Sequence, residues 1–356
     1  MRYKIIGCGR IDRFHIMAAK ENNIEIIALC DIDIKKAQKY IEDYNLFPQT
    51  KIYSDYRKML TKEDIEFVSI ATESDKHAPI AIDVINYGIN VLIEKPVALS
   101  IKDANRIIEA AKKKQVIVSV CHQNRFNPAI QNLRNAIVQK RFGRITHGSV
   151  HIRWNRGTKY YARGDWRGTW EHDGGTLMNQ CIHGIDMLLW MMGGQIKSVY
   201  GEIRNLNHDY IEGEDLGMAV IAFDNGSVAT IEGTTNTYIE AEEACLCIYG
   251  VDGAVKIGGA TMNCIEKWSF VDKQATDSDE YINESVNTVY GNSHPRIFKN
   301  MMTAIENNIE PYVTVEDGKK AMSVILAIYK SSKEHRVVEF PMEDFSTMDM
   351  QKYHFN

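Results

Sequence analysis

The sequence predicts two domains of different fold class: an α/β domain with a doubly wound parallel sheet, followed by an α+β domain with a large, mostly antiparallel open sheet. In the first third of the chain, short apolar runs alternate with stretches of helical spacing, which is typical of a parallel sheet. After Cys121 the apolar runs follow one another across turn sequences such as Asn-Gly and Asp-Gly, which indicates antiparallel pairing. We therefore expect one domain over residues 1–122 and a second over 123–356.

The first domain begins with an apolar run at Tyr3–Ile6, which predicts a buried strand leading into a glycine-rich turn and a helical pattern. Four further buried strands are expected: Ile26–Asp31, Phe67–Ala71, Asn90–Ile93 and Val116–Val120. Helical spacing between these runs predicts helices at Ala78–Tyr87 and Ile101–Lys113.

The second domain is expected to begin with a helix near Pro128–Gln139. Apolar runs then predict strands at Ile145–Arg153, Val199–Ile203, Gly217–Phe223, Ser227–Gly233, Ala244–Tyr249 and Ala254–Ile257. Two helical patterns close the chain, Arg296–Asn307 and Val315–Ser332, and a C-terminal helix is a candidate to pack back on the first domain.

The turn after the first strand carries a dinucleotide-binding pattern. Gly7 permits a tight turn and Gly9 lets the backbone approach a pyrophosphate, which the amides of the next helix then meet. Asp12 stands at the third glycine position and adds a negative charge near the phosphate site. Alone, this pattern is equally consistent with an ordinary strand-to-helix turn. Asp31, at the end of the second strand, completes a Rossmann fingerprint and favours NAD over NADP, because its carboxylate accepts hydrogen bonds from a ribose diol.

A helical pattern over residues 171–190 combines an apolar face with three polar side chains. Asn179, His183 and Asp186 are spaced i, i+4 and i+7, so in an α-helix they share one face. A lone histidine there would more often be a satisfied core residue. The lysine of Glu94-Lys95-Pro96, at the end of a parallel strand, favours instead a catalytic interpretation.

Composition limits the possible functions. The chain has 356 residues, 42 basic and 47 acidic side chains and a net charge of −5, too balanced to indicate nucleic-acid or anionic-membrane binding. No apolar stretch approaches membrane-spanning length, so we expect a cytoplasmic protein. The seven cysteines lack zinc-like or redox spacing, and no metal is expected.

Several motifs together resemble the Gfo/Idh/MocA family of sugar oxidoreductases, and the similarity covers essentially the whole chain. They are GCGRI at 7–11, ALCDID at 28–33, ATESDKH at 71–77, EKP at 94–96, HQNRFNP at 122–128 and WRGTWEHDGGTLMNQCIHGIDMLLW at 166–190. Within the family, the chain most resembles dehydrogenases that oxidise UDP-N-acetylglucosaminuronic acid at C3′ in bacterial polysaccharide biosynthesis. That finer similarity depends on loop features such as Tyr160–Tyr161, Ile211–Asp215 and Val289–Gly291.

The resemblance implies a role for particular residues. The catalytic residues of this chain would be Lys95, His183 and Asn179. Many relatives carry an aspartate at the position of Asn179. Its NAD-binding residues would be Gly7, Gly9, Arg10, Ile11, Asp31, Thr72, His77, Glu94, Lys95, Gln123, Trp166 and Arg167. Its substrate-binding residues would be Lys95, Arg156, Tyr160, Arg163, Asn179 and His183.

The expected activity is NAD-dependent oxidation of the C3′ hydroxyl of a UDP-N-acetylhexosaminuronate. His183 would act as the base and Lys95 would stabilise the charge that develops on the same oxygen. Two alternatives remain: a dehydrogenase of the same family acting on a free sugar or an inositol, and a non-catalytic NAD-binding regulator. The resemblance also implies a homodimer or homotetramer.

Overall fold

The computed structural model describes all residues except 47–48, 239–242, 260, 275–276, 278–290 and 356, so Val289 and Tyr290 lie outside the described residues. The chain forms two compact units. The first contains Met1–Gln123 together with Ser293–Lys319, and the second contains Asn124–Asn292 together with Lys320–Asn356. The segment from Ser293 to the C-terminus therefore contributes to both units. We had expected a boundary after residue 122, with a C-terminal helix as a candidate to pack back on the first domain.

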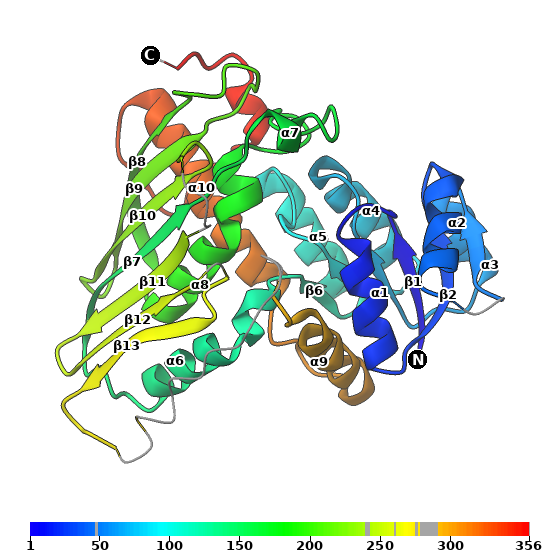
Figure 1. Ribbon diagram of the computed structural model, residues 1–356, viewed down its shortest axis with the longest axis horizontal. Helices are drawn as coiled ribbons and strands as arrows, with labels where there is room; N and C mark the ends of the chain where they lie inside the picture. Colours follow the sequence, from blue (N-terminus) through cyan, green and yellow to red (C-terminus); the bar gives the residue numbers. More distant parts are fainter. Residues whose placement is uncertain (47–48, 239–242, 260, 275–276, 278–290, 356) are drawn as a thin grey trace. The chain divides into compact units, whose positions relative to one another are not determined.

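The first unit is built on a six-stranded sheet with the order β3-β2-β1-β4-β5-β6, and every pair of neighbouring strands in it is parallel (Figure 1). This is the doubly wound Rossmann order. Its strands are β1 (Arg2–Ile6), β2 (Glu25–Cys30), β3 (Lys51–Tyr53), β4 (Phe67–Ile70), β5 (Asn90–Ile93) and β6 (Val118–Val120). The helices between them are α1 (Asp12–Glu21), α2 (Ile34–Asp43), α3 (Tyr56–Lys62), α4 (Ser74–Asn86) and α5 (Ile101–Lys114).

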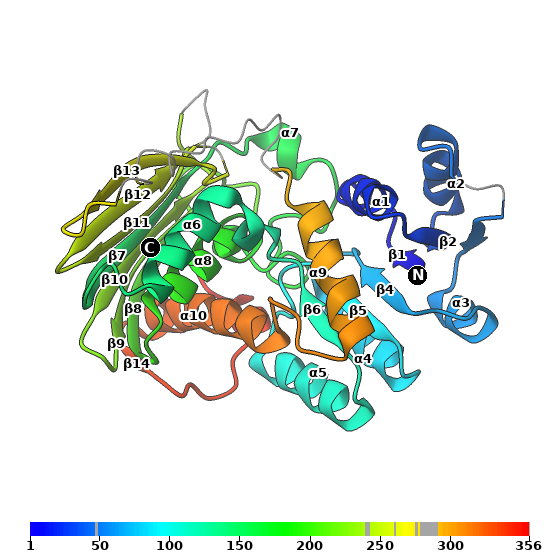
Figure 2. The same ribbon diagram turned by 90° about the horizontal axis from the view of Figure 1, so that it is seen from below.

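Helix α9 (His294–Asn307) packs beside α1 on one face of this sheet, and α4 and α5 lie together on the other (Figure 2). Its Phe298 ring makes an edge contact with Tyr3 of β1 at 5.4 Å between centroids and lies 6.0 Å from Phe67 of β4. All three rings are completely buried, so a late segment of the chain completes the core of the first unit.

The second unit contains an eight-stranded sheet with the order β13-β12-β11-β7-β10-β9-β8-β14. Among its described strands, β7 and β10 are the one parallel pair of neighbours, so the sheet is mostly antiparallel as expected. Its strands are β7 (Ile145–Arg153), β8 (Ile196–Arg204), β9 (Leu216–Phe223), β10 (Val228–Thr234), β11 (Glu243–Gly250), β12 (Gly253–Gly258), β13 (Cys264–Phe270) and β14 (Val338–Glu339).

One face of this sheet is covered by helices of the same unit (Figure 1). Two serines near the end of α10 (Val315–Glu334) accept hydrogen bonds from β8: Gly201 donates to Ser331 Oγ at 3.0 Å, and Ile203 donates to Ser332 Oγ at 3.2 Å. Other helical segments described in the unit are η1 (Gln123–Phe126, starting in the first unit), α6 (Pro128–Val138), α7 (Thr158–Tyr161), η2 (Leu177–Cys181), α8 (Ile182–Met192) and η4 (Thr347–Met350). Among the described helices, none is long and apolar enough to cross a membrane.

The helix expected over residues 171–190 is shorter and is not a regular α-helix. A single π turn, η2 (Leu177–Cys181), precedes α8, and residues 171–173 form turns. A π turn contains more residues than an α-helical turn, so Asn179 and His183 do not repeat at the expected α-helical angle. Asp186 pairs with a different residue, because its carboxylate accepts two hydrogen bonds from the guanidinium of Arg125, at 2.7 and 2.6 Å. The expectation of one continuous polar stripe was therefore wrong.

The Arg125–Asp186 pair is buried, with 3% and 2% of the two side chains exposed. Asp186→Ala should leave the guanidinium buried without its partner and should lower the free energy of unfolding by about 3–5 kcal/mol. Replacing both residues, as Arg125→Met with Asp186→Leu, should cost less than the sum of the single changes. Denaturant unfolding measures this, with Arg57→Met as the control because the Arg57 side chain, which pairs with Asp83, is exposed and such surface pairs contribute little. Equal effects of Asp186→Ala and the control would contradict this role.

Candidate functional site

In the first unit, the expected cofactor residues gather at the carboxyl edge of the parallel sheet. Gly7 follows β1, Asp31 follows β2, Thr72 follows β4, Lys95 follows β5 and Gln123 follows β6. Parallel strands present their carboxyl ends along one edge, which is where open α/β sheets bind ligands. Five segments far apart in the sequence thus contribute to a single rim.

The glycine turn fits a dinucleotide. Gly7 has φ of +98°, and a Cβ atom on it would lie 2.6 Å from the carbonyl oxygen of Ala71, so no larger residue fits. A Cβ atom on Gly9 would meet nothing within 4 Å, so the backbone there is open to a ligand. Arg10 is exposed and Ile11 half-buried in the same turn, immediately before the first residue of α1. The amide end of α1 suits a phosphate group.

Asp31 holds the shape of this turn as well as lying at the expected ribose position. One carboxylate oxygen accepts a hydrogen bond from the Cys8 amide at 2.7 Å, and the other accepts one from the Asp33 amide at 2.8 Å. The Asp31 side chain is only half-buried, so it remains accessible to a ligand hydroxyl.

Burial disfavours the negative charge that the sequence position of Asp12 suggested. The residue is completely buried as the first residue of α1. Burial raises the pKa of the Asp12 carboxyl well above its usual range; the Gly9 backbone opposes this, while Glu94 and Asp31 add to it. The neutral acid is favoured, which removes the expected repulsion of a phosphate.

Two other expected cofactor residues make contacts inside the first unit. The imidazole of His77 bridges the loops after β4 and β5, with 2.7 Å from Nδ1 to the Pro96 carbonyl and 3.1 Å from Nε2 to the Thr72 carbonyl. The carboxylate of Glu94 lies 2.8 Å from His15 Nε2 and accepts the Lys95 amide at 3.2 Å. His77 and Glu94 therefore set the positions of Thr72 and Lys95; direct contact with the cofactor stays a prediction for both.

In the second unit, Asn179 is anchored by a carboxylate that the sequence did not single out. The Asn179 amide nitrogen donates to Asp173 Oδ1, while Asp173 Oδ2 accepts the Gly168 amide at 2.7 Å. Asp173 is 3% exposed and Asn179 is 8% exposed. A single buried carboxylate thus joins the Trp166–Gly168 loop to the π turn.

Gln180 connects Asn179 to the expected substrate residues. Its amide nitrogen donates to Asn179 Oδ1 and to the Tyr160 hydroxyl, the latter at 2.6 Å, and its Oε1 accepts Arg156 Nε at 3.0 Å. The Tyr160 oxygen also accepts Arg167 Nη1 at 2.6 Å. Arg156, Tyr160, Asn179 and Arg167 therefore belong to one polar network centred on Gln180.

The remaining expected residues lie around this network. His183, at the second position of α8, is half-buried, and Trp166 lies under the Arg167 guanidinium at 4.3 Å from the ring centroid. Arg163 is exposed, and none of the side-chain contacts found among the described residues joins it to the network. Arg153, the last residue of β7, lies outside this network and pairs with Glu232 on the neighbouring strand β10 at 2.6 Å.

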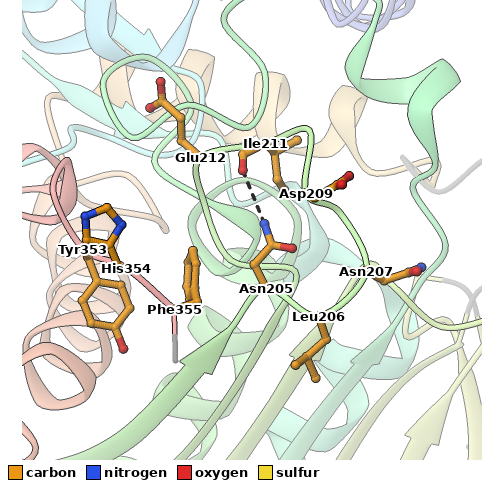
Figure 3. A pocket seen from close by; sticks show the side chains of 9 residues that line it. All are labelled: Asn205, Leu206, Asn207, Asp209, Ile211, Glu212, Tyr353, His354 and Phe355. Atoms are coloured by element: carbon orange, nitrogen blue, oxygen red, sulfur yellow. Dashed lines mark hydrogen bonds between the residues drawn. The ribbon is translucent and has the colours of Figure 1, made fainter.

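A separate hollow of about 560 Å³ lies in the second unit between residues 205–212 and the C-terminal segment Tyr353–Phe355 (Figure 3). Its lining side chains, including Asn205, Asp209 and His354, come from a loop and from the chain end. None of the expected catalytic, cofactor or substrate residues lines it.

Two family models match the chain. The NAD-binding Rossmann fold of the oxidoreductase family matches residues 1–122, and the C-terminal α/β domain of the same family matches residues 134–340. The chain belongs to the Gfo/Idh/MocA oxidoreductase family. It is an NAD-dependent dehydrogenase of that type, as the sequence motifs led us to expect.

Two similar solved structures are WlbA dehydrogenases in complex with NADH and UDP-GlcNAcA. The protein from Bordetella pertussis is 31% identical, with a TM-score of 0.86 over 96% of this chain and 99% of that one. The protein from Chromobacterium violaceum is also 31% identical, with a TM-score of 0.87 and 96% of each chain covered. The myo-inositol 2-dehydrogenase of Thermotoga maritima is 23% identical over 95% of this chain and 98% of its own.

The position of Asp31 predicts that it determines the choice between NAD and NADP. Asp31→Ser should shift the ratio of the two dissociation constants toward NADP by at least about fivefold, because one charge–charge repulsion is worth roughly 1–4 kcal/mol at 4 Å. Fluorescence titration measures both constants. Asp33→Ser is the matched control, since Asp33 caps α2 through the Lys35 amide and a serine preserves that cap. An unchanged ratio in Asp31→Ser would remove Asp31 from the ribose site.

The Asp173–Asn179 contact predicts an unusual pH dependence for Asn179→Asp. The substitution replaces an N–H donor with a second carboxyl beside Asp173, so the pKa of one of the two is raised in the folded protein. A raised carboxyl pKa stabilises the fold at low pH, and this contribution is lost as the pH rises through the folded-state pKa. The thermal midpoint of the variant should therefore fall, relative to the unmodified protein, from acidic to neutral pH. Exposed Asn225→Asp is the control, and parallel profiles for both variants would refute the contact.

Proposed function

We propose that this chain oxidises the C3′ hydroxyl of a UDP-N-acetylhexosaminuronate such as UDP-GlcNAcA, in bacterial polysaccharide biosynthesis. The observation that carries the proposal is the similarity, at 31% identity over 96% of the chain, to two WlbA dehydrogenases whose structures contain NADH and UDP-GlcNAcA. The inositol and apiose dehydrogenases among the relatives are 23% and 24% identical, which gives the free-sugar alternative weaker support.

The polar network of the second unit supports an anionic substrate. Arg156 and Arg167 both converge on Gln180 and Tyr160 from a short loop region. Guanidinium groups bind carboxylate and phosphate groups well, because their planar N–H donors match the geometry of these anions. A free polyol offers no such anion, so this arrangement favours a sugar nucleotide.

The proposed chemistry divides between two residues. NAD, when bound, takes up the hydride from the alcohol carbon. His183 removes the hydroxyl proton, and the Lys95 ammonium donates a hydrogen bond to the oxygen as negative charge develops on it. Asn179 is neutral, and Asp173 behind it fixes the direction in which the Asn179 amide points. Asn179 therefore acts by orienting neighbouring groups. The carboxylate belongs to Asp173, which lies behind the Asn179 amide.

We further propose that the chain self-associates through the open face of its larger sheet. Tyr200 and Val220 are paired neighbours on β8 and β9 and are 43% and 50% exposed, and Met218 on β9 is 49% exposed. Adjacent exposed apolar side chains of this kind are typical of a face that packs against another protein surface. A homodimer or homotetramer would cover them.

The activity is tested by following NADH absorbance with UDP-GlcNAcA, UDP-N-acetylglucosamine and myo-inositol as substrates. We expect turnover with UDP-GlcNAcA only. Lys95→Met and His183→Ala should retain NAD binding, and His183→Ala should lose about 10²–10⁴-fold in kcat, as is usual when a general base is removed. Exposed Lys197→Met and His335→Ala are the controls and should keep full activity.

Each other outcome supports a different alternative. Turnover with myo-inositol and none with the UDP-sugars would favour the free-polyol dehydrogenase. NAD binding without turnover on any substrate would favour the regulator. A loss below tenfold in a folded His183→Ala variant would show that the base is another residue.

A further inference from the structure

Four side chains with metal-binding atoms meet inside the first unit. His15 lies on α1, Glu94 follows β5, Cys121 follows β6 and His294 is the first residue of α9. One potential ligand atom from each lies within 4.8 Å of the other three. His15 and Cys121 are completely buried, and Glu94 and His294 are only 5% and 2% exposed. The group is therefore shielded from water on all sides.

The hydrogen bonds described in the first unit do not explain why the polar ring of His294 is buried. Neither of its ring nitrogens has a hydrogen-bond partner among the described residues. An imidazole in its neutral form presents one nitrogen lone pair, which is the form in which histidine binds a metal ion. A buried polar group without a partner destabilises the folded state, and natural proteins rarely retain one without a reason. Its ring stacks on Phe14 at 5.2 Å, a contact that leaves the nitrogen atoms unsatisfied.

We propose that His15, Glu94, Cys121 and His294 bind one zinc ion. Two imidazoles, a thiolate and a carboxylate are ligands that Zn²⁺ accepts in tetrahedral sites, whereas Mg²⁺ and Ca²⁺ prefer oxygen ligands alone. His15 Nδ1 lies 3.4 Å from the Tyr3 hydroxyl, which is the outer hydrogen bond that metal-bound histidines usually make. On binding, Cys121 would lose its thiol proton to solvent. The proton that lies between His15 Nε2 and Glu94 would move to His15 Nδ1, facing the Tyr3 hydroxyl, so that Nε2 can bind the ion.

The proposed role is structural. Four protein ligands fill a tetrahedral zinc site, so no position remains for water or substrate. The ion would join α9 to α1 and to the ends of β5 and β6, and so fix the segment Ser293–Lys319 in the first unit. Because Glu94 precedes Lys95, it would also hold the strand end that carries this lysine. Zinc at this position is independent of which sugar the enzyme oxidises.

The test begins with the full-length protein, purified from cells grown with added zinc. Elemental analysis after dialysis should find about one zinc per chain, and removal by a chelator should lower the thermal midpoint. Zinc should restore that midpoint, and magnesium should not. Absence of bound zinc, together with a midpoint that neither chelator nor added zinc changes, would overturn the proposal.

Variants identify the ligands. His294→Gln and Cys121→Ser should each lose most of the zinc. The matched controls are His208→Gln, a buried histidine of the second unit, and Cys247→Ser, whose sulfur lies 3.6 Å from Cys245 in an alternative thiol pair. Loss of zinc in Cys247→Ser with retention in Cys121→Ser would place the metal elsewhere and reject the site. If a ligand variant does not fold, the unmodified protein can be loaded with cobalt in place of zinc. We then expect the absorption band of thiolate-to-cobalt charge transfer. Absence of this band would reject Cys121 as a ligand.

Discussion

The close approach of the turn after β1 to the end of β4 is the constraint on which the cofactor site depends. Gly7 adopts a φ of +98°, and the Ala71 carbonyl lies where a Cβ atom on Gly7 would be. The two backbones therefore approach each other with no room for a side chain between them. Any side chain there would push β1 and β4 apart and displace the N-terminus of α1. The opening beside Gly9, the exposed edge of Asp31 and the direction of α1 all follow from that single contact.

In the second unit, a network of hydrogen bonds holds neutral polar side chains in fixed directions. Asp173 accepts hydrogen bonds from the Asn179 side-chain amide and from the Gly168 backbone amide. Gln180 extends the network by hydrogen bonds to Tyr160 and Arg156. The π turn at Leu177–Cys181 makes this possible, because it turns the amides of consecutive residues toward one network. Irregular helical turns are frequent at functional sites for this reason.

Local patterns predicted the regular elements well, because alternation and apolar runs report burial directly. Asn90–Ile93 and Ile145–Arg153 were predicted with the bounds that the structure has. Strand β13 was missed because Glu266 and Lys267 are both exposed where its pairing with β12 shifts register, which breaks the alternation. Strands β3 and β14 are too short to produce a pattern.

Tertiary partners explain most of what the sequence could not reveal about the site. Asp186 had the right spacing for a catalytic face, yet its partner, Arg125, lies 61 positions away along the chain. Gln180 directly follows Asn179 and was overlooked because neighbouring residues point in different directions in an α-helix. Asp173 stood within a recognised motif, but only the fold shows that its carboxylate faces Asn179.

The return of α9 to the first unit has a consequence for biosynthesis. When the first 123 residues leave the ribosome, Tyr3 and Phe67 lack the Phe298 ring that later covers them. The nascent Rossmann sheet must wait, with an apolar surface open, until about 170 more residues have been translated. Exposed apolar surface on a nascent chain favours aggregation, so the order of these segments along the chain leaves this surface open to chaperone binding during synthesis.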